Sequence, residues 1–174
     1  MPLPESGKSL RIPIERIRVP TKPEPSDTVK LSVAEHGDVE ALAALRIEAM
    51  RESLEQIGRF DPIRARERFL SSFVPENTRH ILVAGERVGF LVVKVQSGEL
   101  LLDHLYVKPS FQNRGVGAAV LAQVFAEASA RSLPVRVGAL RESASNRFYT
   151  RHGFQFVEHG EFDNYYIRPS KNAP

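Results

Sequence analysis

The 174-residue sequence contains no cysteine, and this absence removes several classes of function. A chain without cysteine has no disulfide framework, no thiolate-bound metal and no cysteine nucleophile. No apolar run approaches the ~20 residues that a helix needs to cross a membrane. The N-terminus is interrupted too often by proline to form the continuous apolar core of a signal peptide. We therefore expect a cytoplasmic protein that does not associate with membranes.

Two common phosphate-binding signatures are missing as well. The chain has no Gly-Lys-Ser or Gly-Lys-Thr run, which a P-loop requires. Its Gly-x-Gly at Gly115 and Gly117 is followed by Val120, where a dinucleotide-binding fingerprint needs a third small residue. The sequence therefore favours neither a P-loop nucleotide site nor a dinucleotide site.

What is present fits one globular domain with an appended segment. The hydrophobic fraction is 42% and the net charge +3, which suits an anionic cofactor but does not by itself imply nucleic acid. Residues 1–30 contain six prolines that rule out a continuous helix, and apolar residues between Leu10 and Val19 partly alternate with charged ones. This segment is either an ordered arm or a disordered extension. We expect the folded domain over residues 31–168 and a tail over 169–174.

The domain is organised around residues 100–130. Residues 100–107 are apolar and β-prone, residues 108–114 form a polar turn opened by Pro109, and from Gly115 onward apolar residues recur at helical spacing among alanines. The first amides of a helix have no intrahelical partner, and glycine lets an anion approach them closely. The pattern predicts a phosphate cradle, although glycines at such a joint can also serve only to allow tight packing.

The remaining segments complete an α/β pattern of mixed sheet and flanking helices. Asp61-Pro62 and Ser143 are expected to begin two of the helices, and Gly153 to follow the end of the second in a left-handed conformation. The other expected strands are 29–34, 79–84, 88–95, 135–140, 154–158 and 162–167, and the other expected helices run from 37 to about 57 and from 115 to about 130. The element order is β–α–α–β–β–β–α–β–α–β–β.

Two motifs together resemble those of a known superfamily. The run 112–117, QNRGVG, matches Q/R-x-x-G-x-G/A directly after a strand that ends in Leu-Tyr-Val. The run 148–154, FYTRHGF, follows further along the chain. In this order and spacing they resemble the GCN5-related N-acetyltransferase (GNAT) superfamily, over roughly residues 31–168. The resemblance implies a GNAT-like fold, in which the mixed β-sheet is splayed and flanked by helices.

The resemblance also implies a reaction and a cofactor site. Family members transfer an acetyl group from acetyl-coenzyme A to a primary amine by direct attack, with no metal. The glycine motif binds the coenzyme pyrophosphate, and the pantetheine arm pairs with the edge of the central strand. The implied cofactor-binding residues are Leu105, Tyr106, Val107, Gln112, Asn113, Arg114, Gly115, Val116, Gly117, Ala118 and Asn146. Many relatives carry an asparagine seven residues before the motif tyrosine, where this chain has Glu142, so Asn146 is a weak match.

Three residues are candidates for catalysis. By resemblance, the Tyr149 phenol points at the coenzyme sulfur and can protonate the leaving thiolate; the alternative is that Tyr149 is a core aromatic. Asp103 and His104 interrupt an otherwise apolar strand and are candidates for the base that deprotonates the amine. Because consecutive strand residues face opposite sides, at most one of them is expected to face the cleft.

Other functions stay open from the sequence alone. The same fold could serve as a noncatalytic module that binds acyl-coenzyme A, and the arginine-containing N-terminal segment could bind nucleic acid, which we consider unlikely. The acceptor could be a small molecule or a peptide amine, and a homodimer is possible. The acyl group could also differ from acetyl.

Overall fold

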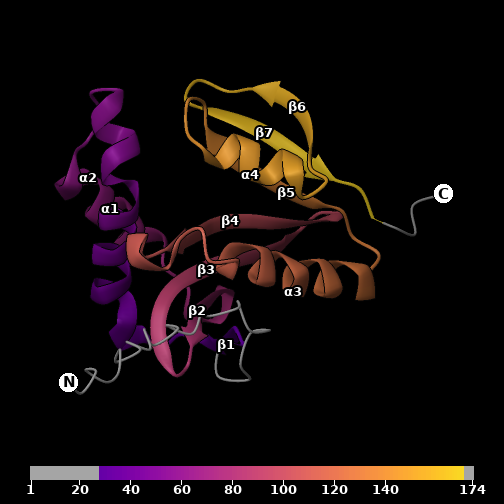
Figure 1. Cartoon of the computed structure of the whole chain (residues 1–174), viewed down its shortest axis with the longest axis horizontal. Coiled ribbons are helices and arrows are strands. Elements are labelled where there is room, and N and C mark those ends of the chain that lie inside the picture. Colours follow the sequence, from indigo (N-terminus) through magenta and orange to yellow (C-terminus); the bar gives the residue numbers. More distant parts are fainter. Residues whose placement is uncertain (1–27, 171–174) are drawn as a thin grey trace, which may run out of the picture.

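The computed structural model describes residues 28–170 as one seven-stranded sheet with helices on both faces (Figure 1). The strand order is β1-β2-β3-β4-β5-β7-β6, and only β4 and β5 run parallel to each other. The strands are β1 (Lys30–Val33), β2 (Thr78–Val83), β3 (Glu86–Gln96), β4 (Glu99–Val107), β5 (Val135–Leu140), β6 (Gln155–His159) and β7 (Asp163–Arg168). The helices are α1 (Val39–Gln56), α2 (Pro62–Ser72), α3 (Val116–Ala130) and α4 (Ser145–Arg151), with three short 3-10 turns.

The predicted order of helices and strands and the α/β class are confirmed. Asp61 begins α2 as expected, because its side chain accepts a hydrogen bond from the Arg64 amide at 3.0 Å. The prediction that Ser143 caps α4 is wrong: Ala144 precedes the helix, and the Ser143 hydroxyl instead donates to the Leu140 carbonyl at 2.8 Å. Residues 1–27 and 171–174, which hold most of the expected arm and tail, lie outside the described residues.

The sheet buries a separate hydrophobic core on each face. On one face α3 and α4 cover a large core that includes Leu100 and Leu102 of β4. On the other face α1 and α2 cover a smaller core, built on Phe69 of α2 and Phe90 of β3. The aromatic rings of Phe69 and Phe90 meet edge to face with their centroids 5.4 Å apart. Each of the two helix layers therefore has its own apolar anchor on the sheet.

A β-bulge in β4 changes which side chains face which core. The register with β3 runs from Val92–His104 directly to Val93–Leu102, so Asp103 is the extra residue. Before the bulge, Leu100 and Leu102 point toward α3, and after it Leu105 and Val107 do. Both Asp103 and His104 consequently point toward α1 and α2.

The sheet opens between β4 and β5 as the family resemblance implies. The two strands pair only from Leu100–Val135 to Leu102–Val137. Beyond that point residues 103–107 of β4 and 138–140 of β5 are not paired with each other. The opening begins where the bulge bends β4, and it leaves backbone groups of β4 without a strand partner on that side.

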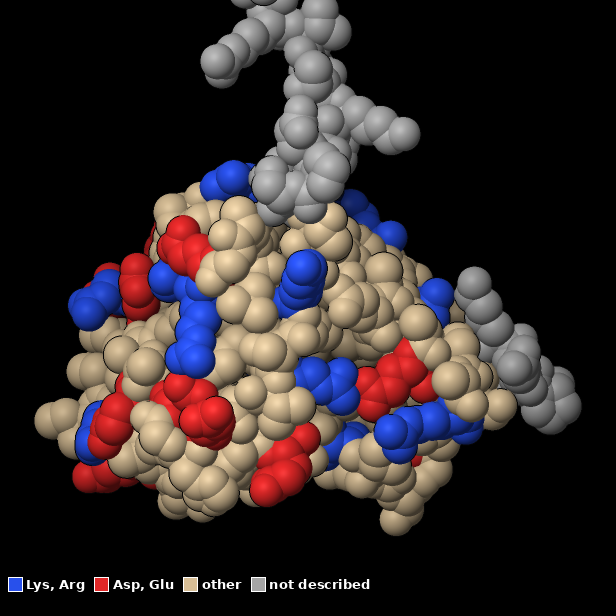
Figure 2. Space-filling view, turned by 90° about the horizontal axis from the view of Figure 1, so that it is seen from below, with Lys and Arg blue, Asp and Glu red and all other residues tan. Residues whose placement is uncertain are grey.

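Charged residues of both signs share the surface. Figure 2 shows a face on which Lys and Arg side chains alternate with Asp and Glu rather than forming a stripe of one sign. Within residues 28–170, no helix has the length and apolar character that crossing a membrane requires.

Candidate active site

The start of α3 has the geometry of an anion site made by the backbone. Gly115 precedes the helix with φ +80°, and no atom lies within 4 Å of the position that a Cβ would occupy. The Ala119 amide donates to the Gly115 carbonyl at 3.0 Å, so the amides of residues 116–118 precede the helical hydrogen-bond ladder. No acidic residue lies in the first turn. An anion can therefore reach amides at the positive end of the helix dipole.

Gly117 serves packing instead. A Cβ at this position would lie 3.0 Å from the Phe148 ring of α4, so the absent side chain makes room for that ring. The two glycines of the motif thus differ: Gly115 leaves the approach to the helix open, whereas Gly117 joins α3 to α4. Tight packing, which the sequence left as the alternative for both glycines, holds for Gly117.

Side chains of the turn before α3 hold the turn to the end of β4. The Gln112 amide donates to the Val107 carbonyl at 2.9 Å. The Arg114 guanidinium lies over the Phe111 ring, 4.8 Å from its centroid. Asn113 has φ +57°, a left-handed conformation that asparagine tolerates. The turn is thereby fixed between the unpaired edge of β4 and the start of α3.

The end of β4 is held close to β3. A Cβ at Gly89 would lie 2.2 Å from the Tyr106 carbonyl oxygen, so only glycine fits there. Leu105 and Val107 pack into the α3 core, while the Tyr106 ring packs on the opposite face against Phe90. The predicted cofactor edge is therefore fixed on one side by β3 and unpaired toward β5.

Tyr149 lies in the α3–α4 core with 6% of its surface exposed. Its ring meets Phe148 and Phe154 edge to face, each with centroids 5.3 Å apart. Burial, and to a smaller extent the nearby Tyr106, raise the pKa of the Tyr149 phenol well above its ordinary value. The phenol is therefore protonated at physiological pH, as a proton donor must be. Both roles that the sequence left open, acid and core aromatic, are compatible with this position.

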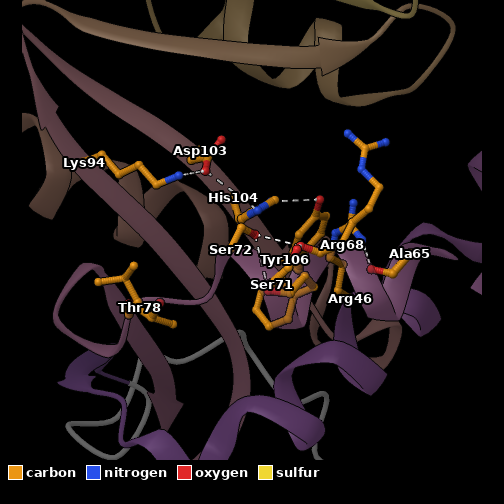
Figure 3. Close-up of polar contacts among 12 residues, drawn as sticks. Arg46, Ala65, Arg68, Ser71, Ser72, Thr78, Lys94, Asp103, His104 and Tyr106 are labelled. Atoms are coloured by element: carbon orange, nitrogen blue, oxygen red, sulfur yellow. Dashed lines mark hydrogen bonds and ion pairs between the residues drawn. The ribbon is translucent and has the colours of Figure 1, made fainter. Parts of the chain in front are cut away.

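Asp103 and His104 line the same small cavity under α2, of about 10 Å³ (Figure 3). The expectation that at most one of them faces this side is wrong, because the bulge puts both on one face. The Asp103 carboxylate lies 2.5 Å from the Lys94 ammonium. The His104 Nε2 is 3.9 Å from Asp103, and its Nδ1 is 3.3 Å from the Tyr106 hydroxyl.

His104 is a weak base in this setting. Burial, opposed by the charge of Asp103 and aided by Arg46 and Lys94, lowers its pKa to about 4. Its ring also lies against Phe69, with centroids 5.8 Å apart. The imidazole is therefore neutral at physiological pH, and protonating it is costly. Neither predicted base candidate is a free, readily protonated group.

Arg46 of α1 completes this face and was not singled out in the sequence. Its Nη1 donates to the Ala65 carbonyl of α2 at 3.0 Å (Figure 3). Its Nε is buried and has no partner, the one such side-chain atom among residues 28–170. Arg46 is one of two arginines in α1, and nothing in the sequence around it distinguishes it from an exposed arginine.

Asn146 has a structural role. Its Nδ2 donates to the carbonyls of Leu140, Arg141 and Ser143 at 2.8, 3.1 and 2.8 Å. Its Oδ1 accepts from the Asn164 amide at 2.9 Å and from the Tyr166 hydroxyl at 2.8 Å. These contacts tie the loop between β5 and α4 to β7. The side chain is fully engaged within the chain, so its predicted contact with a cofactor has no structural support.

A groove of about 460 Å³ opens between the end of α1 and the turn that joins β6 to β7. Its lining is Gln56, Ile57, Arg59, Leu140, Arg141, Glu142, Glu161 and Phe162. The Arg59 guanidinium lies 3.9 Å from the centroid of the Phe162 ring and so bridges the two walls. Leu140 ends β5, so the groove lies at the splayed end of the sheet. Within residues 28–170, no three His, Asp or Glu side chains are placed to hold a metal ion.

Comparisons with known proteins agree with this architecture. Residues 77–156 match the sequence family described as acetyltransferase (GNAT) domain. No curated protein matches the chain. The fold is similar to that of the PaiA N-acetyltransferase from Thermoplasma acidophilum in complex with coenzyme A, with 15% identity over 81% of this chain and 98% of that one and a TM-score of 0.64.

Two further solved structures share the fold. The ribosomal-protein-S18-alanine N-acetyltransferase from Escherichia coli is 20% identical over 84% of this chain and 96% of that one, with a TM-score of 0.60. Ard1 from Thermoplasma volcanium is 22% identical over 80% of this chain and 95% of that one, with a TM-score of 0.58. At such identities the likeness concerns the fold alone. Residues 77–156 thus match a GNAT acetyltransferase domain, and the chain as a whole shares the fold of solved acetyltransferases.

Proposed function

We propose that this protein is an N-acetyltransferase that transfers the acetyl group of acetyl-coenzyme A directly to a primary amine. One observation carries the proposal: a backbone anion site at the start of α3 adjoins the unpaired edge of β4 where the sheet opens. This combination suits a ligand with a phosphate at one end and amide groups along an extended arm. One structure with this fold was solved with coenzyme A bound.

The residues that fit the coenzyme lie in one continuous stretch. The amides of Val116, Gly117 and Ala118 and the open backbone at Gly115 would hold the pyrophosphate. The unpaired backbone of residues 105–107 would pair with the amides of the pantetheine arm as an added strand does. One of these backbone amides would also stabilise negative charge on the carbonyl oxygen during attack.

Acetyl-coenzyme A supplies an activated thioester, and the chain supplies the proton donor and the acceptor site. Tyr149 donates a proton to the departing sulfur, and its burial keeps the phenol protonated until then. The groove between α1 and the β6–β7 turn admits the amine from the opposite face of the sheet. Attack from that face places the amine and the thioester on two sides of one opening.

Binding and turnover test the proposal separately. Titration calorimetry should show that coenzyme A binds, and a thiol-release assay over a panel of amines should show turnover that depends on both substrates. The panel covers polyamines, aminoglycosides, amino acids and peptides with a free N-terminus. Coenzyme A binding without thiol release by any amine would indicate a noncatalytic acyl-coenzyme A module instead. Absence of binding would contradict the cofactor site itself.

A further inference from the structure

The proposed reaction requires a base, and the structure holds a candidate apart from Asp103 and His104. An alkylammonium loses two protons when it becomes an amide: one leaves with the thiol and the other must reach solvent. Lys94 pairs with Asp103, and the His104 ring packs against Phe69 under α2. The second proton therefore needs another acceptor on the amine side.

Asp163, the first residue of β7, is a carboxylate at the splayed end of the sheet. It pairs in register with Leu140, the last residue of β5 and part of the groove lining. Its backbone carbonyl accepts from the Gly160 amide at 2.7 Å, which fixes the turn. The side chain is half-buried and has no hydrogen bond or ion pair within residues 28–170. Burial penalises the charged form of a carboxylate, and within residues 28–170 no partner offsets that penalty at Asp163.

Asp163 and Tyr106 lie on the same face of the sheet. On β7, Tyr166 points into the α3–α4 core, so strand alternation places Asp163 on the α1–α2 side. On β4, the bulge places Tyr106 on that same side. The two residues occupy opposite sides of the opening between β4 and β5.

The other charges at this end of the sheet are distributed around the groove. Arg59 follows α1, Arg141 and Glu142 follow β5, and Glu161 belongs to the same turn as Asp163. On the β4 side of the opening, the corresponding groups are Tyr106 of β4 and Arg46 of α1. Arg59 is occupied by the Phe162 ring. None of these groups forms an ion pair with Asp163 in the part of the chain that the structure describes.

We propose that Asp163 binds the ammonium group of the acceptor and removes one of its protons. The inference depends on the proposed acetyl transfer. In the step, Asp163 accepts one proton from the ammonium, and the freed nitrogen lone pair forms the bond to the acetyl carbon. As the C–S bond breaks, Tyr149 gives its proton to the thiolate. The second nitrogen proton then passes to Tyr149 and restores its hydroxyl, and Asp163 releases its own proton to solvent. One ammonium and one thioester yield one amide, one thiol and one proton.

Partial burial changes the acid–base properties of the Asp163 carboxyl. Burial raises the pKa of its carboxyl, with no hydrogen bond to counter it. A raised pKa makes a carboxylate a stronger base than a fully solvated one. The same shift has a cost for the fold. A group whose pKa is raised on folding loses its stabilising contribution as the pH rises through that pKa, so ionised Asp163 destabilises the folded chain at neutral pH.

The test compares Asp163→Asn with Glu76→Gln, a matched removal of charge at an exposed carboxylate that does not line the groove. With an amine that the wild type accepts, we expect Asp163→Asn to lower kcat/KM by 10²–10⁴-fold near pH 7. The loss should shrink toward pH ~10, where a lysine-like amine deprotonates without help. Glu76→Gln should stay within about threefold of wild type, a change below about 0.7 kcal/mol. Coenzyme A affinity should be unchanged in both variants.

Two further readouts separate catalysis from structure. The thermal midpoint of Asp163→Asn at neutral pH should equal or exceed that of wild type, because the substitution removes a half-buried charge that has no partner within residues 28–170. Asp163→Glu should recover part of the activity. Wild-type turnover with an unchanged pH profile in Asp163→Asn overturns this inference alone. An equal loss at all pH values together with a lower thermal midpoint also overturns it, in favour of a structural role. Absence of turnover in the wild type overturns the proposed function and this inference together.

Discussion

The two sides of the opening between β4 and β5 are built by different means. On the α3 side the site consists of backbone groups from one stretch, residues 105–118, with Gly115 keeping the approach open. On the α1–α2 side it consists of side chains from three separate elements, Tyr106 on β4, Asp163 on β7 and Arg46 on α1. A backbone site requires a local conformation, whereas a side-chain site requires distant elements to meet. The first kind can be recognised in a short motif and the second cannot.

The two sides also differ electrostatically. The first turn of α3 carries no acidic residue, and the helix dipole favours negative charge there. The opposite side holds an unpaired carboxylate, a low-pKa histidine and a buried arginine within one region. An anionic cofactor would thus meet a complementary site at α3, and a cationic acceptor would meet the Asp163 carboxylate on the other side. The following substitutions test this division, in order of expected effect.

The largest effect is expected from Tyr149→Phe. The change removes one hydroxyl that makes no hydrogen bond within residues 28–170 and keeps the ring that packs on Phe154. If the phenol protonates the leaving thiolate, steady-state kinetics should show kcat lower by roughly 10²–10⁴-fold. Coenzyme A affinity and the thermal midpoint should change little. A fall of only about twofold would assign Tyr149 to the core, since a thiol of pKa about 8.5 leaves readily without assistance.

The next effect concerns the backbone site. Gly115→Asp would introduce a negative charge beside the amides of α3. We expect coenzyme A affinity to fall by about 100-fold, because two negative charges at close range repel each other by a few kcal/mol. Gly98→Asp is the matched control, because Gly98 has φ +79° and equally open space at the opposite end of β4. Both variants carry the same left-handed strain of about 1–2 kcal/mol. Calorimetry showing equal affinity in the two variants would contradict the anion site.

The smallest effect on function should come from substituting Asn146. The family resemblance implied that this residue contacts the cofactor, whereas the structure gives it hydrogen bonds within the chain. Asn146→Ala removes the contacts to β7 and leaves the Tyr166 hydroxyl without its acceptor. Urea unfolding should show a loss of about 2–3 kcal/mol, because several partners lose hydrogen bonds at once. The control Ser143→Ala removes one bond to Leu140 and should cost about 1 kcal/mol or less. A coenzyme A affinity reduced tenfold or more in folded Asn146→Ala would restore the contact that the family resemblance implied.

Much of the fold could be predicted because local patterns and the final structure agree. The alternation of apolar residues, the proline after Asp61 and the glycine after α4 each favour the local conformation that the structure shows. The splayed sheet was expected only through the family resemblance. The strand, turn and helix start that carry the proposed anion site could also be predicted, since they follow one another directly along the chain.

The bulge at Asp103 is where prediction from strand alternation fails. Alternation assigns Asp103 and His104 to opposite faces, but one extra residue in β4 turns both toward α2. A bulge is set by pairing with the neighbouring strand, and nothing in the residues themselves fixes its position. The same limit applies to Gly117, whose absent side chain matters because Phe148 packs against it from another helix.

The sequence by itself determined the order of elements and the strand–turn–helix run from β4 to α3, because each of these depends on residues that are neighbours along the chain. Only the tertiary structure decided which side chains meet on the α1–α2 side of the opening between β4 and β5. Lys94 engages Asp103, burial weakens His104, and Asp163 is left as an unpaired carboxylate across the opening from Tyr106. The burial of each of these side chains and its pairing with other charges depend on how α1 and α2 pack against the sheet near the β4–β5 opening. For that reason the strength of each base follows from the fold and cannot be assigned from residue type.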